Sequence, residues 1–469
     1  MTLIGLELND TGILAAADDS DGLIALEDGA PASPGFALPH KKDLLVGRAA
    51  ASKAHLFPRQ ILNRFWDQLS AEPLERATRH APENNAEIAY RHLAFIWPRL
   101  QKFGDEIVVL TPGFYEKPQL GLILGIAQEL GMPVTGFLPL ALAAASRPVP
   151  DEMLLHLDIH LHRLEVGYLE PGARLTLRDT ATTSEKGLLY LYRQWVDAIA
   201  REFVRSTRFD PFHQAASEQQ LYDRLSAMIS HMQHNASMSL ELNGKAATYS
   251  ITLERDLLVR GGESVYRELV RLIEHMQAKR AGGAKATVLQ VSNRLARLPG
   301  CMEMLRSIRG ARIVELDQGA GVFGALENWR GLQAQHKAPG ISFFTSIPRQ
   351  RPCPPENRAP AAGTGMSLRP THLLYRSLAY PLTDKQITIG SDPGGKEDGL
   401  AIVVEAFGVS PRHCIVTLIG GESVLINTSD QGTFVDEKKV TGSMTLKLGQ
   451  IIRVGEPGAK FQLIACRDA

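Results

Sequence analysis

The sequence predicts a mixed α/β domain followed by an all-β sandwich. In the first two thirds of the chain, short β runs alternate with amphipathic helical stretches, which is typical of an α/β domain. After a proline-rich segment, short β runs recur with Gly, Asp and Asn between them and without a convincing helix, which is typical of a sandwich of about 100 residues. We therefore expect a domain over residues 1–331, a linker over 332–370 and a second domain over 371–469.

The elements of the first domain follow from the periodicity of apolar residues. A helix over 118–130 is closed by Gly131 as its C-cap, with Pro133 beyond it. Asn243-Gly244 lies between two alternating runs and marks a hairpin. The other expected helices are Leu189–Arg205 and Ser264–Ala278, and the expected strands are Ile4–Leu8, Ile107–Thr111, Met153–Leu161, Thr287–Val291 and Arg312–Leu316.

The linker is predicted from proline alone. Seven prolines occur from Pro339 to Pro370. Proline lacks a backbone donor and fixes φ, so we expect this segment to be extended and to lie outside helices and sheets.

Composition excludes several classes of protein. Lys+Arg and Asp+Glu are both 51, and this balance argues against nucleic acid as a partner. The four cysteines are scattered, which argues against a disulfide framework or zinc ribbon and fits a reducing cytoplasm. No apolar run approaches the roughly 20 residues of a bilayer span, and the N-terminus lacks the features of a signal peptide, so we expect no membrane insertion.

Residues 153–166 read M-L-L-H-L-D-I-H-L-H-R-L-E-V, with apolar and polar residues in alternation. In a strand, the polar set would line one face. Neutral imidazoles and a carboxylate suit Zn²⁺ or Fe²⁺, so a metal site is one interpretation. A phosphate contact and a plain polar strand face are the two others, and we favour the last. The polar set is His156, Asp158, His160 and His162.

Three blocks, at residues 44–58, 108–145 and 316–326, occur in an order that resembles the ATPase domain of the seventy-kilodalton class of heat-shock chaperones. That family belongs to the actin and sugar-kinase superfamily. The resemblance covers most of residues 1–330 and implies a duplicated α/β ATPase fold. The chaperone's peptide-binding β-domain and helical lid have no counterpart, so we do not expect a foldase.

The resemblance weakens where the family places its phosphate loops, because glycines there let the backbone approach phosphate. In the first hairpin, L-E-L-N-D-T-G, Glu7 stands where the family has Asp, Asn9 where it has Gly, and Asp10 where it has a small hydroxyl residue. In the second, D-I-H-L-H-R-L-E, Asp158 is kept but His160-Leu161-His162 replaces the glycine turn.

The family's catalytic groups are also missing. The lysine position offers only Arg64, and Leu138 stands where the family has its water-orienting glutamate. The adenosine loop, from Val291, lacks its paired glycines. We expect no ATP turnover and assign no catalytic residue. ATP or ADP with Mg²⁺ is the alternative, with Glu7 and Asp158 holding the cation through water. The degenerate cleft would comprise Glu7, Asn9, Asp10, Thr11, Asp158, His160, His162, Asn293 and Arg294.

Four motifs carry a second resemblance: I-T-I-G-S (387–391), S-P-R-H-C (410–414), D-Q-G-T-F-V (430–435) and L-K-L-G-Q-I-I-R-V-G (446–455). With this spacing, residues 371–469 resemble a forkhead-associated (FHA) domain. The resemblance implies a β-sandwich whose loops at one end bind phosphothreonine peptides.

The FHA loops depart from the family at the phosphate. Ser391 replaces the arginine of I-G-R, and Gln431 replaces the loop asparagine, next to Asp430. Arg412 and Lys385 are candidates to compensate, and phosphate-independent binding is the favoured alternative to phosphothreonine recognition. The expected partner-binding residues are Ser391, Ser410, Arg412, Ser429, Asp430 and Gln431, with His413 and Gly432 structural.

The sequence is compatible with two functions. The first is a non-catalytic interaction or scaffold protein of the cytoplasm, in bacterial-type signalling or assembly, whose FHA domain docks a protein partner. The second is a switch in which ATP or ADP binding to the first domain gates (phospho)protein binding by the second.

Overall fold

The structure is a computed structural model of the chain. Its description covers residues 2–20, 22–40, 43–74, 82–145, 152–245, 247–279, 286–335, 340–348, 370–375, 378–383, 385–393, 399–404, 408–419, 422–436, 438–455 and 458–464. The chain divides into two compact units, residues 1–354 and 355–469, which are described separately. Among the described residues, no helix has the length and apolar character needed to cross a membrane.

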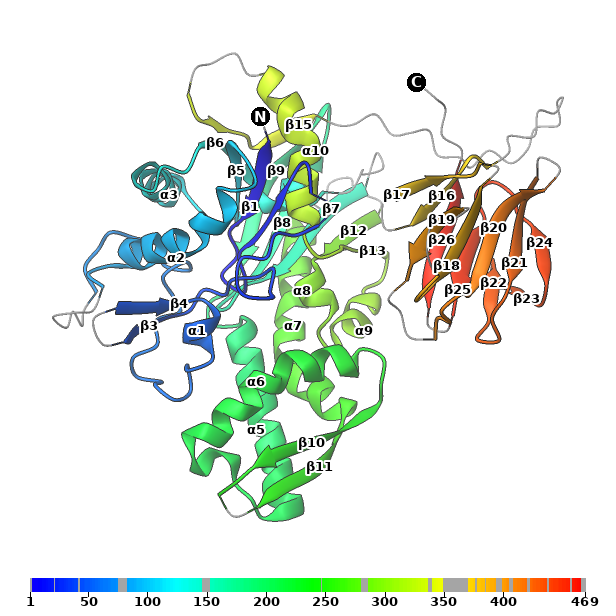
Figure 1. The fold of residues 1–469 in the computed structure, drawn as a ribbon. Coiled ribbons are helices and arrows are strands. Elements are labelled where there is room, and N and C mark those ends of the chain that lie inside the picture. Colours follow the sequence, from blue (N-terminus) through cyan, green and yellow to red (C-terminus); the bar gives the residue numbers. More distant parts are fainter. Residues whose placement is uncertain are drawn as a thin grey trace. The chain divides into compact units, whose positions relative to one another are not determined.

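The first unit contains two main sheets (Figure 1). In the first sheet the strand order is β14-β6-β5-β1-β2, with β1 antiparallel to β2 and parallel to β5. Every residue of β1 and β2 is buried, as expected for apolar strands covered on both faces. The strands are β1 Leu3–Glu7, β2 Leu14–Ala17, β5 Glu106–Thr111, β6 Val134–Pro139 and β14 Ser342–Phe343.

The second sheet repeats this pairing pattern, with the order β13-β12-β7-β8-β9-β15. Its first strand, β7, is antiparallel to the next strand, β8, and parallel to the later strand β12. Its strands are β7 Glu152–Ile159, β8 Leu164–Pro171, β9 Arg174–Thr182, β12 Ala286–Val291, β13 Ala311–Glu315 and β15 Ser346–Pro348.

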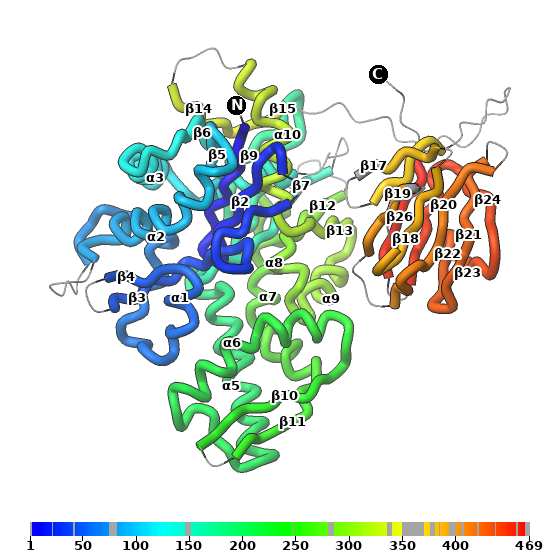
Figure 2. Tube along the Cα trace, in the orientation of Figure 1, coloured from blue at the N-terminus to red at the C-terminus, as the bar shows by residue number. Residues whose placement is uncertain are grey.

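Helices α4 (Leu140–Ala143) and α10 (Ala320–Gln335) pack tightly against each other and share one buried core with strands of both sheets. Figure 2 shows α10 next to β15. A Cβ added at Gly324 would lie 2.0 Å from the backbone oxygen of Ala143, so only glycine permits this approach. The other short elements of the unit are β3 Ala37–His40, β4 Asp43–Val46, α1 Arg48–Ala51, η1 Pro211–His213, α8 Asn293–Ala296 and α9 Cys301–Arg306.

Two further helices belong to the first sheet's half of the unit. Helix α2 (Asn85–Leu100) begins after Asn84, whose side chain accepts a hydrogen bond from the Glu87 amide. Helix α3 (Lys117–Glu129) has proline in its first turn, and Gly131 beyond its end has a φ of 63°. The helix predicted over 118–130 is therefore confirmed within one residue at each end.

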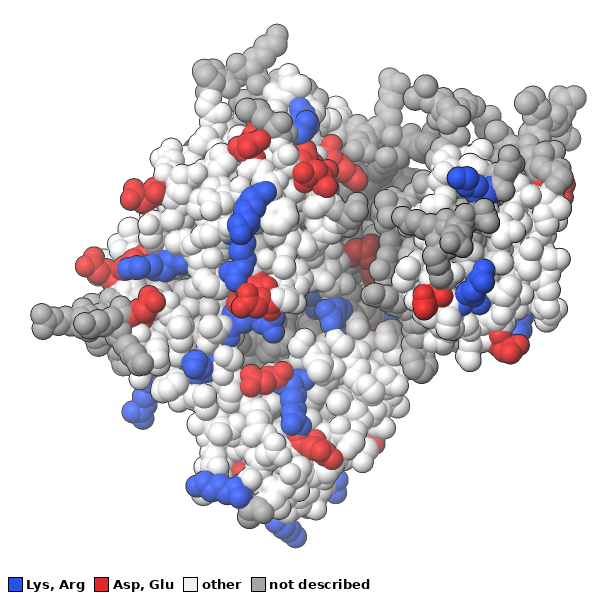
Figure 3. Space-filling model, viewed as in Figure 1, with Lys and Arg blue, Asp and Glu red and all other residues white. Residues whose placement is uncertain are grey.

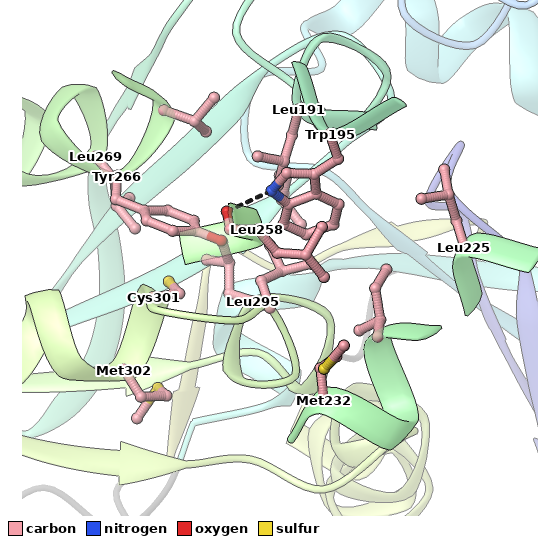
Figure 4. Close-up of a cluster of buried hydrophobic side chains, with 14 of the residues drawn as sticks. Leu191, Trp195, Leu225, Met232, Leu258, Tyr266, Leu269, Leu295, Cys301 and Met302 are labelled. Atoms are coloured by element: carbon pink, nitrogen blue, oxygen red, sulfur yellow. Dashed lines mark hydrogen bonds between the residues drawn. The ribbon is translucent and has the colours of Figure 1, made fainter. Parts of the chain in front are cut away.

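A helical subdomain projects from the second sheet (Figure 1). It contains α5 (Leu188–Thr207), α6 (Ala215–Met232), α7 (Arg255–Lys279) and the hairpin of β10 (Ser237–Asn243) and β11 (Thr248–Glu254). Two buried polar rings anchor its core. Trp195 Nε1 donates to the Leu258 oxygen at 2.7 Å, as Figure 4 shows, and Tyr266 OH donates to the Pro299 oxygen at 2.8 Å.

Helix α7 begins at Arg255, earlier than the predicted start at Ser264. The predicted helix starts after Gly261 and Gly262, which are weak helix formers. In the structure these glycines are packing sites, because a Cβ at Gly261 would lie 2.8 Å from the Trp195 ring and one at Gly262 would lie 2.6 Å from the Tyr266 ring.

The predicted linker begins too early. Helix α10 continues to Gln335, and strands β14 and β15 lie inside the segment 332–370, where they pair with β6 and β9. Most of the prolines come later in the segment, and Pro348 ends an edge strand, where a missing donor is tolerated. Residues 349–369 of the predicted linker lie outside the described residues.

The second unit is a β-sandwich of two sheets, with orders β17-β16-β26-β25-β22-β23 and β19-β18-β20-β21-β24. Its core includes Ile387, Cys414, Val454 and Phe461, all 0–1% exposed. The strands are β16 His372–Tyr375, β17 Leu378–Pro381, β18 Gln386–Gly390, β19 Gly399–Val403, β20 Cys414–Ile419, β21 Glu422–Asn427, β22 Thr433–Val435, β23 Lys438–Val440, β24 Ser443–Thr445, β25 Ile451–Val454 and β26 Ala459–Ile464.

Candidate functional site

A cavity of about 430 Å³ in the first unit collects most of the residues predicted for the cleft. Glu7 ends β1, and Asp158 lies near the end of β7. Both residues line the cavity, so the carboxyl ends of β1 and β7 meet there. Asn293 and Arg294, on α8 after β12, also line it.

Arg294 binds both carboxylates. Its Nη1 lies 3.0 and 3.3 Å from the two Asp158 oxygens, and its Nη2 donates to Glu7. Both acids are buried, at 1% and 2% exposure. Burial raises the pKa of Asp158, and the charge of His160 opposes this shift. The guanidinium thus occupies the space between the two carboxylates that a bound cation would need.

In the two predicted phosphate hairpins, side chains accept backbone amides both within the first hairpin and between the two. The Thr11 amide donates to Asn9 Oδ1 at 2.9 Å, and the Leu161 amide donates to Asp10 Oδ1 at 2.8 Å. Asn9 Nδ2 donates in turn to Asp158 Oδ2 at 3.2 Å. Side chains of the cleft therefore already use the hydrogen-bond donors that a phosphate would take.

His160 lies between two acids at this position. Its Nε2 is 3.2 Å from Glu165 Oε2, and its Nδ1 is 3.7 Å from Asp10 Oδ1. Burial opposes a charge on the ring, but the hydrogen bond to Glu165 and the charges of Glu165 and Asp10 outweigh it and raise the pKa of His160 to about 9. His160 is therefore a buried cation at neutral pH. Sequence reasoning missed Glu165, although it pairs with Asp158 in the β7–β8 register.

The polar face predicted for residues 156–162 is not one continuous strand face. Strand β7 ends at Ile159, because the His160 amide donates to the Arg163 oxygen and closes a turn. His162 Nε2 then contacts the Asn63 oxygen at 3.0 Å, away from His160's acids. Among the described residues no group of three or more His, Cys, Asp or Glu side chains could hold a metal ion. The geometry does not support the metal interpretation.

The two other departures from the family also have a clear place in the structure. Leu138 is fully buried in the core shared by the two sheets, so its position offers no group to orient water. Arg64 is bound to Glu185, with Nη2 2.6 Å from the carboxylate, and lies 3.7 Å from Asp67.

A set of contacts holds the segment after α1 against α6, two parts of the unit that are far apart in sequence. The rings of His55 and Tyr222 stack with centroids 3.5 Å apart and planes 10° apart. The His55 amide donates to Gln219 Oε1 at 2.8 Å, and His55 Nδ1 lies 3.2 Å from Glu218 Oε1. We call these four residues the His55 latch.

A buried chain of hydrogen-bonded side chains, which sequence reasoning missed, contains a serine, a histidine and a glutamate, the residue types of a serine-nucleophile site. Its hydrogen bonds run in the direction opposite to the one that such a site needs. Trp66 Nε1 donates to His92 Nδ1 at 3.0 Å, so the proton of His92 is on Nε2, 2.8 Å from Ser33 Oγ. Ser33 donates onward to Glu27 at 2.6 Å. Burial lowers the pKa of His92 to about 3. His92 donates to the serine and cannot act as its base, so the chain is structural.

In the second unit, the loops at one end of the sandwich are bound together by His413. Its buried ring accepts from the Ser410 amide at 3.1 Å through Nδ1 and contacts the Gly432 oxygen at 3.1 Å through Nε2. Gly432 has a φ of 93°, which favours glycine. Beside this ring, the hydroxyls of Ser410 and Ser429 are 2.6 Å apart.

The remaining predicted residues surround this serine pair. The Ser391 amide donates to the Ser410 oxygen at 3.0 Å, and the Gln431 amide donates to Ser429 Oγ at 3.1 Å. Arg412 and Asp430 are exposed on the same loops. The loop end therefore presents hydroxyl groups and charges of both signs.

Lys385 cannot serve this site. Lys385 precedes β18, whereas Ser391 follows β18. The five residues of this strand span about 17 Å at the rise of a strand. The prediction that Lys385 compensates for the missing arginine is therefore wrong, since the two positions are at opposite ends of one strand.

The comparison with protein families agrees with this architecture. Residues 387–455 match the family of the FHA domain. The predicted β-sandwich of the second unit is confirmed as an FHA domain, a class of module that binds phosphothreonine-containing proteins. No curated protein matches the chain. The chaperone-like ATPase fold of the first unit stays a prediction.

Proposed function

We propose that this chain is a non-catalytic interaction protein. Its FHA domain binds a protein partner, and its first unit, residues 1–354, forms an actin-like ATPase fold that no longer hydrolyses ATP. The observation that carries the proposal is the position of Arg294, whose guanidinium binds Glu7 and Asp158 together.

The pairing pattern of the two sheets supports the actin-like fold. In each sheet the first strand is antiparallel to the strand that follows it and parallel to a later one, as expected of a duplicated domain. The carboxyl ends of β1 and β7 carry the two polar turns and meet at one cavity. In open α/β sheets, ligand sites form beyond the carboxyl ends of the strands.

The loss of hydrolysis follows from the chemistry of phosphoryl transfer. Such catalysis needs a metal ion on the phosphates, backbone amides around them and a group that orients the nucleophile. Here an arginine lies between the acids, Asn9 and Asp10 accept the loop amides, and Leu138 is buried in the core.

For the FHA domain we propose recognition that depends little on phosphate. The paired hydroxyls of Ser410 and Ser429 could accept or donate to a peptide, but Ser391 supplies no charge where the family has arginine. A charge-assisted hydrogen bond is roughly twice as strong as a neutral one. A phosphate on the peptide therefore adds less binding free energy here than in a domain that has the arginine.

Two measurements test the proposal. ATP turnover by the purified chain should equal that of Arg294→Ala and of a no-enzyme control; turnover above the control would refute the loss of hydrolysis.

An array of threonine-phosphorylated peptides and their unphosphorylated counterparts should show bound sequences whose signal survives phosphatase treatment and falls with Ser410→Ala. Binding confined to the phosphorylated members would show instead that phosphate recognition is retained.

A nucleotide-gated switch is the second candidate, favoured by the 430 Å³ cavity next to Asn293 and Arg294. Calorimetry with ATP and ADP, each with and without Mg²⁺, separates it from the first. Micromolar binding would support the switch, and absence of heat at millimolar nucleotide would exclude it.

A further inference from the structure

A groove on the helical subdomain lies between α5 and α7, and it shares no described lining residue with the cavity of the cleft. The hollow measures about 560 Å³, and each described residue that lines it belongs to one of these two helices. Small residues leave this space open, among them Ala198, Gly261 and Ser264. A Cβ at Gly261 would lie 2.8 Å from the Trp195 ring, so the two helices pack closely beneath the groove.

The groove carries a local excess of positive charge. Four arginines and two glutamates line it, whereas Lys+Arg and Asp+Glu are both 51 in the whole chain. On the face of the first unit that Figure 3 shows, charged side chains of both signs are scattered among each other. A positive groove in a neutral chain favours an anionic ligand at this place. The arginines are Arg201 and Arg205 on α5 and Arg260 and Arg267 on α7.

Two of the arginines are held by the glutamates. Arg205 donates to Glu202 through Nε at 2.9 Å and through Nη2 at 2.6 Å. Arg267 Nη2 donates to Glu263 Oε1 at 2.5 Å. A guanidinium has five N–H donors, so both side chains keep donors for a ligand while the glutamates fix their positions.

The other two arginines are available for a ligand, one on each helix. Arg201 and Arg260 are exposed, and neither forms an ion pair within the part of the chain that the structure describes. A negative group in the groove would therefore gain two counter-charges without first breaking an existing ion pair.

The spacing of the charges indicates the kind of anion. Arg260 and Arg267 are seven residues apart on one helix, which places them about 10 Å apart along its axis. Charges spread over this length suit several carboxylates in a row better than a single phosphate. The described lining residues include no aromatic side chain, whereas sites for single-stranded nucleic acid stack bases on aromatic rings.

We propose that the groove between α5 and α7 docks an acidic segment of a partner protein, in which several Asp or Glu residues follow one another. In an extended segment, successive side chains point to opposite sides, so the carboxylates would reach the arginines of both helices. This docking site goes beyond the proposed function, because it gives the first unit a partner of its own and does not depend on the state of the cleft.

Fluorescence anisotropy on the full-length chain tests the proposal, with a labelled peptide that contains six consecutive glutamates and a matched peptide with six glutamines. Only the glutamate peptide should bind, and its affinity should fall as salt is raised from 50 to 500 mM, on the order of a Debye-screening effect. The double variant Arg201→Ala, Arg260→Ala should weaken binding about tenfold, as the loss of two exposed ion pairs would.

The matched control is the double variant Arg193→Ala, Arg271→Ala. It removes two exposed arginines from the same two helices but outside the groove, so the net charge changes equally. Binding of the glutamate peptide by this control should stay close to that of the wild type. Equal losses in the two double variants would mean attraction by net charge alone and would overturn the proposal.

Ser264→Trp tests the groove itself, because Ser264 is exposed and lines the hollow, so a large ring there fills it while all four arginines stay. Loss of binding in this variant supports docking inside the groove, and unchanged binding would overturn it. Absence of binding by the glutamate peptide would also overturn the proposal, as would tighter binding of a labelled oligothymidylate with the same charge. None of these outcomes involves the FHA loops or ATP turnover, so the proposed function stands in each case.

Discussion

Arg294 and Asp158 form an ion pair with Nη1 and Oδ2 3.0 Å apart, on residues separated by 136 positions in the chain. The second guanidinium nitrogen donates to Glu7, so one arginine from α8 bridges the first strands of both sheets. Three charges in one buried cluster are stable only when they compensate each other. This bridge fixes the geometry of the cleft and gives the first prediction.

Arg294→Ala should lower the free energy of unfolding by about 2–4 kcal/mol, because it leaves two buried carboxylates without their counter-charge. Mg²⁺ should then stabilise the variant but not the wild type, since the acids could share a cation once the guanidinium is gone. Chemical denaturation with and without millimolar Mg²⁺ measures both effects. Arg297→Ala is the matched control, since Arg297 lines the same cavity but bonds a serine. Equal Mg²⁺ effects on wild type and variant would contradict this reading.

The pH dependence of stability should carry the signature of His160. In the unfolded chain its pKa is near the ordinary 6.5, and in the folded protein it is about 9. The folded state therefore holds the proton more tightly, so this stabilisation is complete below pH 6.5 and is lost as pH rises through 9. We expect a decrease of about 2–3 kcal/mol in the free energy of unfolding across this window.

Urea denaturation at a series of pH values from 6 to 9.5 measures this slope, and His160→Gln should flatten it. His162→Gln is the matched control: burial lowers the pKa of His162, so this histidine cannot produce the same slope. If His160→Gln retains the full pH dependence, the proton is held elsewhere.

The sequence predicted local features of the first unit better than long-range ones. The expected strands lie within one or two residues of β1, β5, β7, β12 and β13, because apolar runs and turn residues are local signals. The start of α7 was missed because Gly261 and Gly262 meet aromatic rings that no local pattern reveals. The bridge from Arg294 to Glu7 joins residues 287 positions apart. The sequence therefore predicted that Arg294 lies in the cleft but not that it binds the two acids.

The fold of the FHA unit could be predicted more fully from the sequence, because its motifs lie in short loops whose spacing is set by the strands between them. His413 and Gly432 are 19 positions apart and bond each other, as their assigned structural role requires. Lys385 is close to Ser391 in the sequence but lies at the other end of β18, because a strand carries the chain away from its own start.

The His55 latch should restrict opening of the first unit. Tyr222→Ala removes the ring that stacks on His55 at 3.5 Å, a contact worth about 0.5–1.5 kcal/mol beyond the area it buries. Hydrogen exchange measured by mass spectrometry should become faster in the segment that contains α1 and His55. Tyr249→Ala, which removes a similar stack on Phe209 in the helical subdomain, should leave exchange in that segment unchanged. Faster exchange in both variants would point to general destabilisation instead.

The last prediction concerns the arginine that the FHA loops lack. Ser391 is exposed, and its amide donates to the backbone oxygen of Ser410. A side chain at position 391 therefore starts close to Ser410, whose hydroxyl pairs with that of Ser429. Ser391→Arg should raise the affinity for phosphothreonine peptides by about tenfold, as one charge-assisted hydrogen bond to phosphate would. Affinity for the unphosphorylated peptides should not change.

Fluorescence anisotropy with a labelled phosphothreonine peptide library and its unphosphorylated counterpart measures the gain in affinity. Lys385→Arg is the control, because it places a guanidinium at the far end of β18 and should have no effect. Adding Ser410→Ala to Ser391→Arg should remove most of the gain if the hydroxyl and the new guanidinium grip the same phosphate. A wild type that already binds phosphothreonine as tightly as Ser391→Arg would show that Arg412 supplies the charge, and the domain would then be a phosphate reader with a relocated arginine.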